Sequence, residues 1–232
     1  MFDWADALRA DGYAFVQSAS MREALEVDGL AGWEAFARSW DDLGLDTYMA
    51  DGGRYRKRRH AVFRADADGI VRKSDQPHYQ SRDYNALNGG IQRWFAPMLP
   101  EVADGPAFRS ILRFCHRLFN GLTPLPAWHV EAHQFRIEAS TDQAGQPTPE
   151  GMHQDGVDWV LVLMIERQNI ASGMTNIYGL DRRPIGSFTL EQPMDAALVD
   201  DHLVFHGVTP VRPLDPSRAA YRDVLVVTFR RE

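Results

Sequence analysis

Cysteine is almost absent from this sequence of 232 residues, which contains only Cys115. A single cysteine cannot form an internal disulfide, so the chain fits a reducing, cytoplasmic location. The apolar context RSILRFCHRLF predicts that Cys115 is a buried small side chain. A nucleophilic role would require a lowered thiol pKa, for which the only local arguments are His116 and nearby arginines.

Long hydrophobic runs and a surplus of basic residues are also missing. No apolar run approaches the ~20 residues that span a bilayer, and the N-terminal MFDWADALRADGY lacks the apolar core of a secretory signal. The formal net charge is -7, which opposes nucleic acid as the main partner because phosphate binding needs excess Lys and Arg. The composition, 44% hydrophobic and 25% charged, is typical of a globular protein.

One basic segment departs from this balance, RYRKRRH at residues 54–60. Read as a strand, it places Arg54, Arg56, Arg58 and His60 on one face. Two interpretations are open: a solvated strand whose charges are offset by nearby acids, or arginines that reach into an anionic pocket. We favour the solvated strand.

Residues 1–125 are expected to be mostly helical, serving as support and substrate-side elements. A helix in ADALRADG can end at Gly12, and Leu30 to Leu43 and Pro106 to Phe119 carry apolar residues at helical spacing. The segment YAFVQS interrupts this region as a short predicted strand.

The character of the chain changes after Pro126. Short β-rich runs separated by turn residues follow, among them WVLVLMIE, MTNIYGL, IGSFTLEQ, HLVFHGVTPV and RDVLVVTFRR. Such spacing without helical patterns predicts a sandwich or jelly roll. We therefore expect a mainly β fold with some α: a sandwich or jelly-roll core over 126–232, with the helical N-terminal part packed on it, in a single domain spanning 1–232.

The segment PEGMHQDGVDWVLVLMIE contains the strongest candidate for a metal site. In extended chain, His153 and Asp155 point to the same side and can bind one ion. The strand-like HLVFHGV supplies a third candidate, His206, on a strand that a jelly roll can return beside the first. Two histidines and one carboxylate are the donors of a non-haem Fe(II) centre, which leaves coordination positions open.

A rival group lies in WHVEAHQF, where His129, Glu131 and His133 alternate along one predicted strand. Three ligands from one nearly straight strand make a poor closed polyhedron. We expect these residues to form a polar outer face. The opposite face then becomes the pocket side, carrying Trp128, Val130, Ala132, Gln134 and Arg136.

The chain resembles the 2-oxoglutarate–Fe(II) dioxygenase family, which includes bacterial free L-amino-acid hydroxylases and BsmA-like proteins. The resemblance is dense over about residues 126–232 and rests on QFRIEAS, PTPEGMHQDGVDWVLVLMIERQN, SGMTNIYG, HGVTPVRPLDP and YRDVLVVTFRR. It implies a double-stranded β-helix core, Fe(II) as cofactor, and 2-oxoglutarate and O2 as co-substrates. Carried over by motif, His153, Asp155 and His206 become the iron ligands.

The resemblance also implies a cation for the distal carboxylate of 2-oxoglutarate, an arginine early on the last core strand. Arg222 in YRDVLVVTF is our candidate and Arg218 is the alternative. Many relatives carry a hydroxyl residue two positions later, where this chain has Val224. For the primary substrate we expect contacts from Gln134 and Arg136, with Asp158 and Trp159 as further candidates.

The predicted function is hydroxylation of a small molecule, a free L-amino acid, with release of succinate and CO2. No catalytic residue is expected beyond the iron centre. Two alternatives remain open at this point. One is a cupin-like metal-binding or regulatory protein without turnover, and the other is an oxygenase of the same chemistry that acts on nucleic acid or protein.

Overall fold

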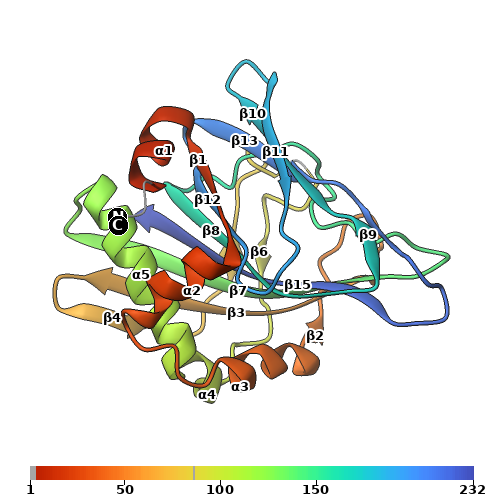
Figure 1. Cartoon of the computed structure of the whole chain (residues 1–232), viewed down its shortest axis with the longest axis horizontal. Coiled ribbons are helices and arrows are strands. Elements are labelled where there is room, and N and C mark those ends of the chain that lie inside the picture. The colour runs from red at the N-terminus through yellow and green to blue at the C-terminus, as the bar shows by residue number, and fades with distance from the viewer. Residues whose placement is uncertain (1–3, 86) are drawn as a thin grey trace.

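An eight-stranded antiparallel sheet forms the centre of the molecule (Figure 1). The computed structural model describes residues 4–85 and 87–232. The strand order of this sheet is β1-β12-β8-β15-β7-β3-β2, with β4 paired to β3. Three smaller sheets have the orders β11-β10-β13, β14-β9 and β5-β6.

The helices are α1 (Trp4–Asp11), α2 (Ser18–Glu26), α3 (Trp33–Arg38), the 3-10 helix η1 (Ser39–Asp42), α4 (Pro100–Ala103) and α5 (Pro106–Leu122). The strands of the large sheet are β1 (Tyr13–Val16), β2 (Gly44–Leu45), β3 (Arg56–Asp66), β4 (Gly69–Arg72), β7 (Ala127–Ala139), β8 (Trp159–Gln168), β12 (Ala196–Asp200) and β15 (Ala220–Arg231). The remaining strands are β5 (His78–Tyr79), β6 (Gln92–Arg93), β9 (Ile170–Ser172), β10 (Met174–Gly179), β11 (Pro184–Thr189), β13 (Val204–Val208) and β14 (Val211–Pro213).

Helix α5 follows directly from its sequence. Pro106 stands at the start, where a missing N–H costs nothing, and apolar residues recur every three or four positions. The side chains of Phe108, Ile111, Cys115 and Phe119 are fully buried against the large sheet. The predictions of this helix, of a helix ending before Gly12 and of a strand in YAFVQS are confirmed.

The central strand β15 has two buried faces. Leu225, Val227 and Phe229 pack into the main core beneath the helices. The alternate residues Val224 and Val226 point to the other side, toward the small sheets and the cavity described below. Strands buried on both faces read as continuous apolar runs, as VLVVTF does here.

The expectation that residues 1–125 are mostly helical requires correction. These residues also supply β1 to β6, and β3 pairs with β7 from Arg56 to Asp66, opposite Ile137 to Ala127. Figure 1 shows β3, β7 and β15 side by side, although they come from the beginning, middle and end of the sequence. The N-terminal half therefore builds part of the sheet that carries the site. No helix of the described part of the chain is long and apolar enough to cross a membrane.

Candidate active site

A cavity of about 470 Å³ lies on the face of the large sheet opposite the main helices. Its floor is built from β3, β7 and β15 together with β8 and β12, and it is surrounded by residues 76–81, 84–85, 93, 147–148, 150, 153 and 155–157. Its volume falls within the range of pockets that bind small molecules. All three predicted metal ligands and Arg222 line this one cavity.

The three predicted metal ligands converge at one side of the cavity. His153 stands before β8 and forms an isolated antiparallel bridge with His206 of β13, with both backbone N–H···O distances at 2.9 Å. The carboxylate of Asp155 lies 3.6 Å from His153 Nε2 and 3.5 Å from His206 Nε2. The possible ligand atoms all lie within 4.8 Å of one another. Two imidazole nitrogens and one carboxylate at this separation fit Fe(II).

The electrostatics of this group suit a cation. Burial alone would lower the pKa of His153, but the hydrogen bond and charge of Asp155 raise it to about 9. Burial and the charge of His153 lower the pKa of His206 to about 4. Burial would raise the pKa of Asp155, yet the two histidines lower it well below its ordinary range. Gly151 O accepts a bond from His153 Nδ1 at 3.0 Å, so Nε2 is the nitrogen that faces Asp155 and that a metal would bind in place of its proton.

Asp201 and Gly156 fix the segment that carries Asp155. The carboxylate of Asp201 accepts backbone N–H bonds from Asp155 (2.9 Å), Gly156 (2.7 Å) and Val157 (3.1 Å). Sequence analysis missed Asp201, because an acidic pair at the end of a strand reads as an ordinary turn. Gly156 has φ +78°, and a Cβ there would lie 2.5 Å from the ring of Tyr84. Its role as a bend after the ligands follows from this left-handed conformation.

Arg222 is buried at another part of the cavity, with 2% of its surface exposed. Its Nε and Nη2 have no hydrogen-bond partner among the described residues. Burial and the charge of Arg167 lower the pKa of Arg222 to about 10, so the side chain remains cationic at neutral pH. The alternative, Arg218, is exposed in the loop before β15 and does not line the cavity. Of the two, only Arg222 can receive a carboxylate inside the cavity.

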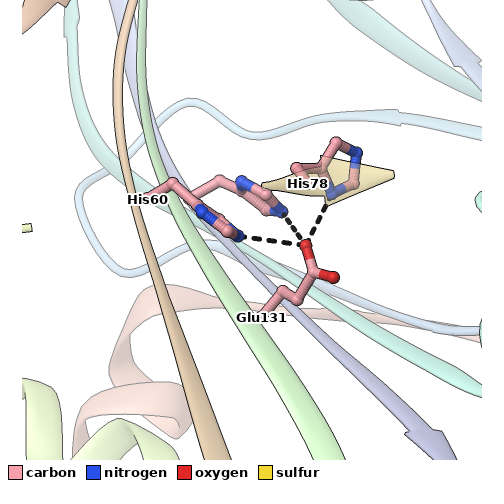
Figure 2. A group of neighbouring side chains, drawn as sticks. His60, His78 and Glu131 are labelled. Atoms are coloured by element: carbon pink, nitrogen blue, oxygen red, sulfur yellow. Dashed lines mark hydrogen bonds and ion pairs between the residues drawn. The ribbon is translucent and has the colours of Figure 1, made fainter. Parts of the chain in front are cut away.

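A second group of histidines surrounds Glu131 on the cavity floor (Figure 2). Oε2 of Glu131 lies 3.1 Å from His60 Nε2, 2.5 Å from His78 Nδ1 and 3.5 Å from His133 Nε2. Oε1 lies 3.1 Å from His129 Nε2. Burial would raise the pKa of Glu131, but these imidazoles lower it well below its ordinary value.

Hydrogen bonds from Arg58 and Lys73 determine which ring nitrogen of His133 and of His129 carries the proton. Arg58 Nη2 lies 2.7 Å from His133 Nδ1, and Lys73 Nζ lies 3.3 Å from His129 Nδ1. A guanidinium and an ammonium can only donate, so each imidazole carries its proton on Nε2 and donates it to Glu131. The Nε2 atoms of these two imidazoles thus donate an N–H to Glu131 and have no lone pair free to bind a metal. We describe the group as a carboxylate held by imidazole donors.

The interpretation of the two faces of β7 is therefore wrong. His129, Glu131 and His133 face the cavity rather than solvent, while Trp128, Val130 and Ala132 pack under the helices. The reason is that both faces of this strand are covered, and the more apolar face packs against the helices.

The residues proposed for the primary substrate lie outside the cavity. Gln134 Nε2 donates to Ser39 Oγ at 2.8 Å on the helix side. Arg136 forms two bonds with Asp223, at 2.8 and 2.7 Å, and one with Asp41 at 2.9 Å. Because β7 presents its other face to the cavity, neither side chain lines it.

Asp158 and Trp159 do not line the cavity either. Asp158 forms an ion pair with Arg231 and a bond to His202. Trp159 stacks on Phe119 of α5 at a centroid distance of 5.5 Å. Asp158 and Trp159 thus make contacts with the C-terminal strand and with α5, one and two residues beyond the turn that orients Asp155.

The interpretation of residues 54–60 as a solvated strand is also wrong. Arg56 and Arg58 are 6% and 4% exposed and line the cavity. The predicted alternation is observed, since Arg56, Arg58 and His60 share one buried face of β3. That face is the floor of the cavity rather than the surface.

Comparison with known proteins identifies the family. The family model for 2OG-Fe dioxygenases matches residues 37–228, and the chain belongs to this family. It is a non-haem iron oxidoreductase that uses Fe(II) and 2-oxoglutarate.

Three relatives extend the comparison. The chain is 28% identical to a 3(1)-hydroxy-L-isoleucine 4-dioxygenase of Pantoea ananatis (strain AJ13355), over 100% of this chain and 96% of that protein. It is 28% identical to an L-isoleucine-4-hydroxylase of Bacillus thuringiensis, over 71% of this chain and 69% of that protein. A bsmA homolog from Methylobium petroleophilum PM1 has a similar crystal structure, with a TM-score of 0.90 and 36% identity, covering 98% of this chain and 92% of that one.

Proposed function

We propose that this dioxygenase hydroxylates a free L-amino acid at Fe(II) held by His153, Asp155 and His206, with 2-oxoglutarate anchored by Arg222. The observation that carries the proposal is the convergence, in one cavity, of three metal-binding side chains and a buried guanidinium with free N–H donors. A facial set of three ligands leaves positions for a chelating co-substrate and O2. A guanidinium meets a carboxylate through two parallel bonds.

The choice of an amino acid as substrate rests on the relatives and on size. Two relatives are named for action on L-isoleucine or a hydroxylated form of it. A cavity of about 470 Å³ has room for two small molecules but not for a folded macromolecule. The net charge of -7 also disfavours nucleic acid.

The protein contributes positioning and shielding to this reaction. Bound Fe(II) supplies the coupled oxidation of 2-oxoglutarate by O2 to succinate and CO2 and the transfer of one oxygen atom to the substrate. Gly151 orients His153 through its carbonyl, and Asp201 fixes the backbone of Asp155. Val162, Val224 and Val226 form an apolar part of the floor that limits water near the reacting carbon.

The antiparallel sheets of the molecule can be assigned to a more specific fold. We propose that the large sheet and the opposing β11-β10-β13 and β14-β9 sheets correspond to a double-stranded β-helix. The chain would then act as one domain over 1–232, since β3 and β7 pair across the division at residue 125. The isolated bridge between residues 153 and 206 joins the segment before β8 to β13, the end strand of the β11-β10-β13 sheet.

The test is an anaerobic loading with Fe(II) and 2-oxoglutarate, followed by admission of O2 and single L-amino acids. Succinate and a product heavier by one oxygen are measured together. We expect both products for wild type and neither for His153→Ala or His206→Ala. His202→Ala is the matched control, because His202 is an exposed histidine outside the cavity whose side chain contacts Asp158.

Persistent succinate formation in His153→Ala would contradict the metal assignment. Bound Fe(II) without succinate for any amino acid would favour the cupin-like binding protein over an amino-acid hydroxylase. Succinate formation only with a peptide or nucleic acid would keep the chemistry and overturn the substrate.

A further inference from the structure

Three buried arginines form one wall of the cavity, and we call Arg56, Arg58 and Arg93 the arginine wall. Each is at most 6% exposed and each lines the cavity. Asp46 pairs with two of them, at 2.8 Å from Arg56 Nη2 and 3.5 Å from Arg58 Nη1. Among the residues that the structure describes, Arg93 forms no ion pair. Two of the three guanidiniums thus share one carboxylate, and the third has none within ion-pair distance in the described structure.

Two other carboxylates near this wall, Glu131 and Glu150, face other groups, although Oε2 of Glu150 is buried without a hydrogen-bond partner among the described residues. Glu131 accepts bonds from the surrounding imidazoles (Figure 2). Glu150 lies 3.6 Å from His153 Nε2 and belongs to the neighbourhood of the metal ligands. Neither is within ion-pair distance of Arg93 in the described structure. Among the described residues Arg93 therefore has no ion-pair partner, and Asp46, Glu150 and Glu131 act on its charge only from a longer distance.

Unused hydrogen-bond donors point to the same conclusion. Nε of Arg93 and Nε of Arg58 are buried without an acceptor among the described residues. Among the described residues, the one hydrogen-bond acceptor for the Arg93 side chain is the amide oxygen of Gln80, at 3.5 Å from Nη2, and the guanidinium also lies 5.9 Å from the ring centroid of Phe95. A buried charge without a partner lowers the stability of the fold. A buried arginine that lines a cavity without an ion-pair partner therefore indicates an anionic ligand that pairs with it.

The wall is also held in place. The guanidinium of Arg58 lies 3.5 Å from the ring centroid of Phe95 and 4.4 Å from that of Phe135. Its Nη2 is fixed by His133 Nδ1. Burial and the nearby Arg56 lower the pKa values of Arg58 and Arg93, as expected for like charges kept close together.

We propose that Arg93, supported by Arg56 and Arg58, binds the carboxylate of the primary substrate. The inference rests on the proposed function, since it requires a substrate that carries a carboxylate, as a free amino acid does. Arg222 provides a separate cation for 2-oxoglutarate, so the cavity has one anion site for each of its two organic substrates. Arg93 would select acids over the corresponding amides.

The test compares L-isoleucine with L-isoleucinamide in wild type, Arg93→Met and Arg93→Lys. For Arg93→Met we expect the KM for L-isoleucine to rise on the order of 100-fold, and the preference for the acid over the amide to disappear. Arg93→Lys keeps the charge without the paired N–H donors, so its KM for L-isoleucine should lie between those of wild type and Arg93→Met. The KM for 2-oxoglutarate should change less than about 3-fold. Arg82→Met is the control, because Arg82 is an exposed arginine that does not line the cavity.

Thermal unfolding of the substrate-free protein separates this role from a structural one. Removing an uncompensated buried charge should leave the Tm of Arg93→Met equal to or above that of wild type. A lowered Tm with an unchanged KM for L-isoleucine would overturn the proposal. An equal rise in KM for 2-oxoglutarate would assign Arg93 to the co-substrate instead.

A further measurement applies if no amino acid is turned over and the proposed function fails. Isovalerate, a small apolar carboxylate, is titrated into protein saturated with Fe(II) and 2-oxoglutarate without O2. Thermal stabilisation of wild type but not of Arg93→Met supports the anion site. Equal stabilisation of both proteins overturns it.

Discussion

Arg56 and Arg222 occupy the same row of the large sheet, each paired across the backbone with Ile137 of β7 from opposite sides. Two strand spacings, about 10 Å, separate their backbones. Both side chains line the cavity, and one comes from the first quarter of the chain while the other comes from its last strand. Segments that are distant in the sequence therefore build the floor of the site together. The contributions of Arg56 and Arg222 can be tested by separate substitutions.

Replacement of Arg222 should weaken 2-oxoglutarate selectively. In Arg222→Met we expect the KM for 2-oxoglutarate to rise on the order of 100-fold, because the variant loses a paired, charge-assisted contact inside the cavity. Steady-state succinate formation at varied 2-oxoglutarate measures this. Arg218→Met, at the exposed alternative, should match wild type; the reverse result would exchange the two assignments.

Asp201 should control the affinity for the metal without contacting it. Asp201→Asn keeps one acceptor oxygen for the three N–H groups of residues 155–157, so the backbone of Asp155 is less well fixed. We expect metal affinity to fall about 10-fold or more, measured by calorimetry with Fe(II) under anaerobic conditions. Asp200→Asn, at the neighbouring residue, is the control and should change affinity by much less.

Asp46 should stabilise the fold in a pH-dependent way. Asp46→Asn leaves Arg56 and Arg58 buried without their carboxylate, and we expect the free energy of unfolding to fall by about 3 kcal/mol at neutral pH. Asp42→Asn removes an ion pair of Arg59 from a largely exposed carboxylate and should cost below about 1 kcal/mol. Urea unfolding measures both.

The pH dependence follows from the pKa of Asp46. Burial alone would raise that pKa, but the charges of Arg56 and Arg58 lower it below the ordinary value of 3.8. The stabilising contribution is therefore present above pH 3.8 and is lost as the pH falls through the lowered pKa. The stability difference between wild type and Asp46→Asn should shrink in that acidic window. A difference that grows on acidification would contradict the assignment.

Gly156 should tolerate alanine much less well than Gly151. Both have positive φ, +78° and +76°, so alanine costs about 1 kcal/mol at either from the left-handed backbone. A Cβ at 156 would in addition lie 2.5 Å from the ring of Tyr84, whereas at 151 it would meet nothing within 4 Å. We expect Gly156→Ala to lower both stability and metal affinity more than Gly151→Ala. Adding Tyr84→Ala should restore part of the loss; no restoration would exclude the ring contact as the cause.

The sequence predicts correctly those features that a local pattern of residues marks. His153 and Asp155 precede an apolar strand, and the structure brings His206 to them. Helix α5 and strand β1 were predictable because apolar spacing and a bounding Pro or Gly mark them locally. Helix α5 and strand β1 are each determined by residues that are close together in the sequence.

The sequence was misleading where the deciding contact is distant. Polar residues on β3 and β7 were assigned to solvent, since alternation of polar and apolar residues is the pattern of a sheet with one exposed face. Here the polar face is buried under other elements and forms the cavity floor. Only the pairing of β3 with β7 and the placement of β5 and β6 over them reveal this, and no local pattern encodes either.

Strand β15 lies between β7 and β8, and it follows every other strand of the large sheet along the chain. During synthesis on the ribosome, β7 and β8 must therefore emerge and wait with unpaired edges until residues 220–231 leave the exit tunnel. Exposed strand edges promote pairing with other chains. Yield in a cell should thus depend on translation speed and on chaperones that cover such edges, more strongly than for a protein whose central strands are made first.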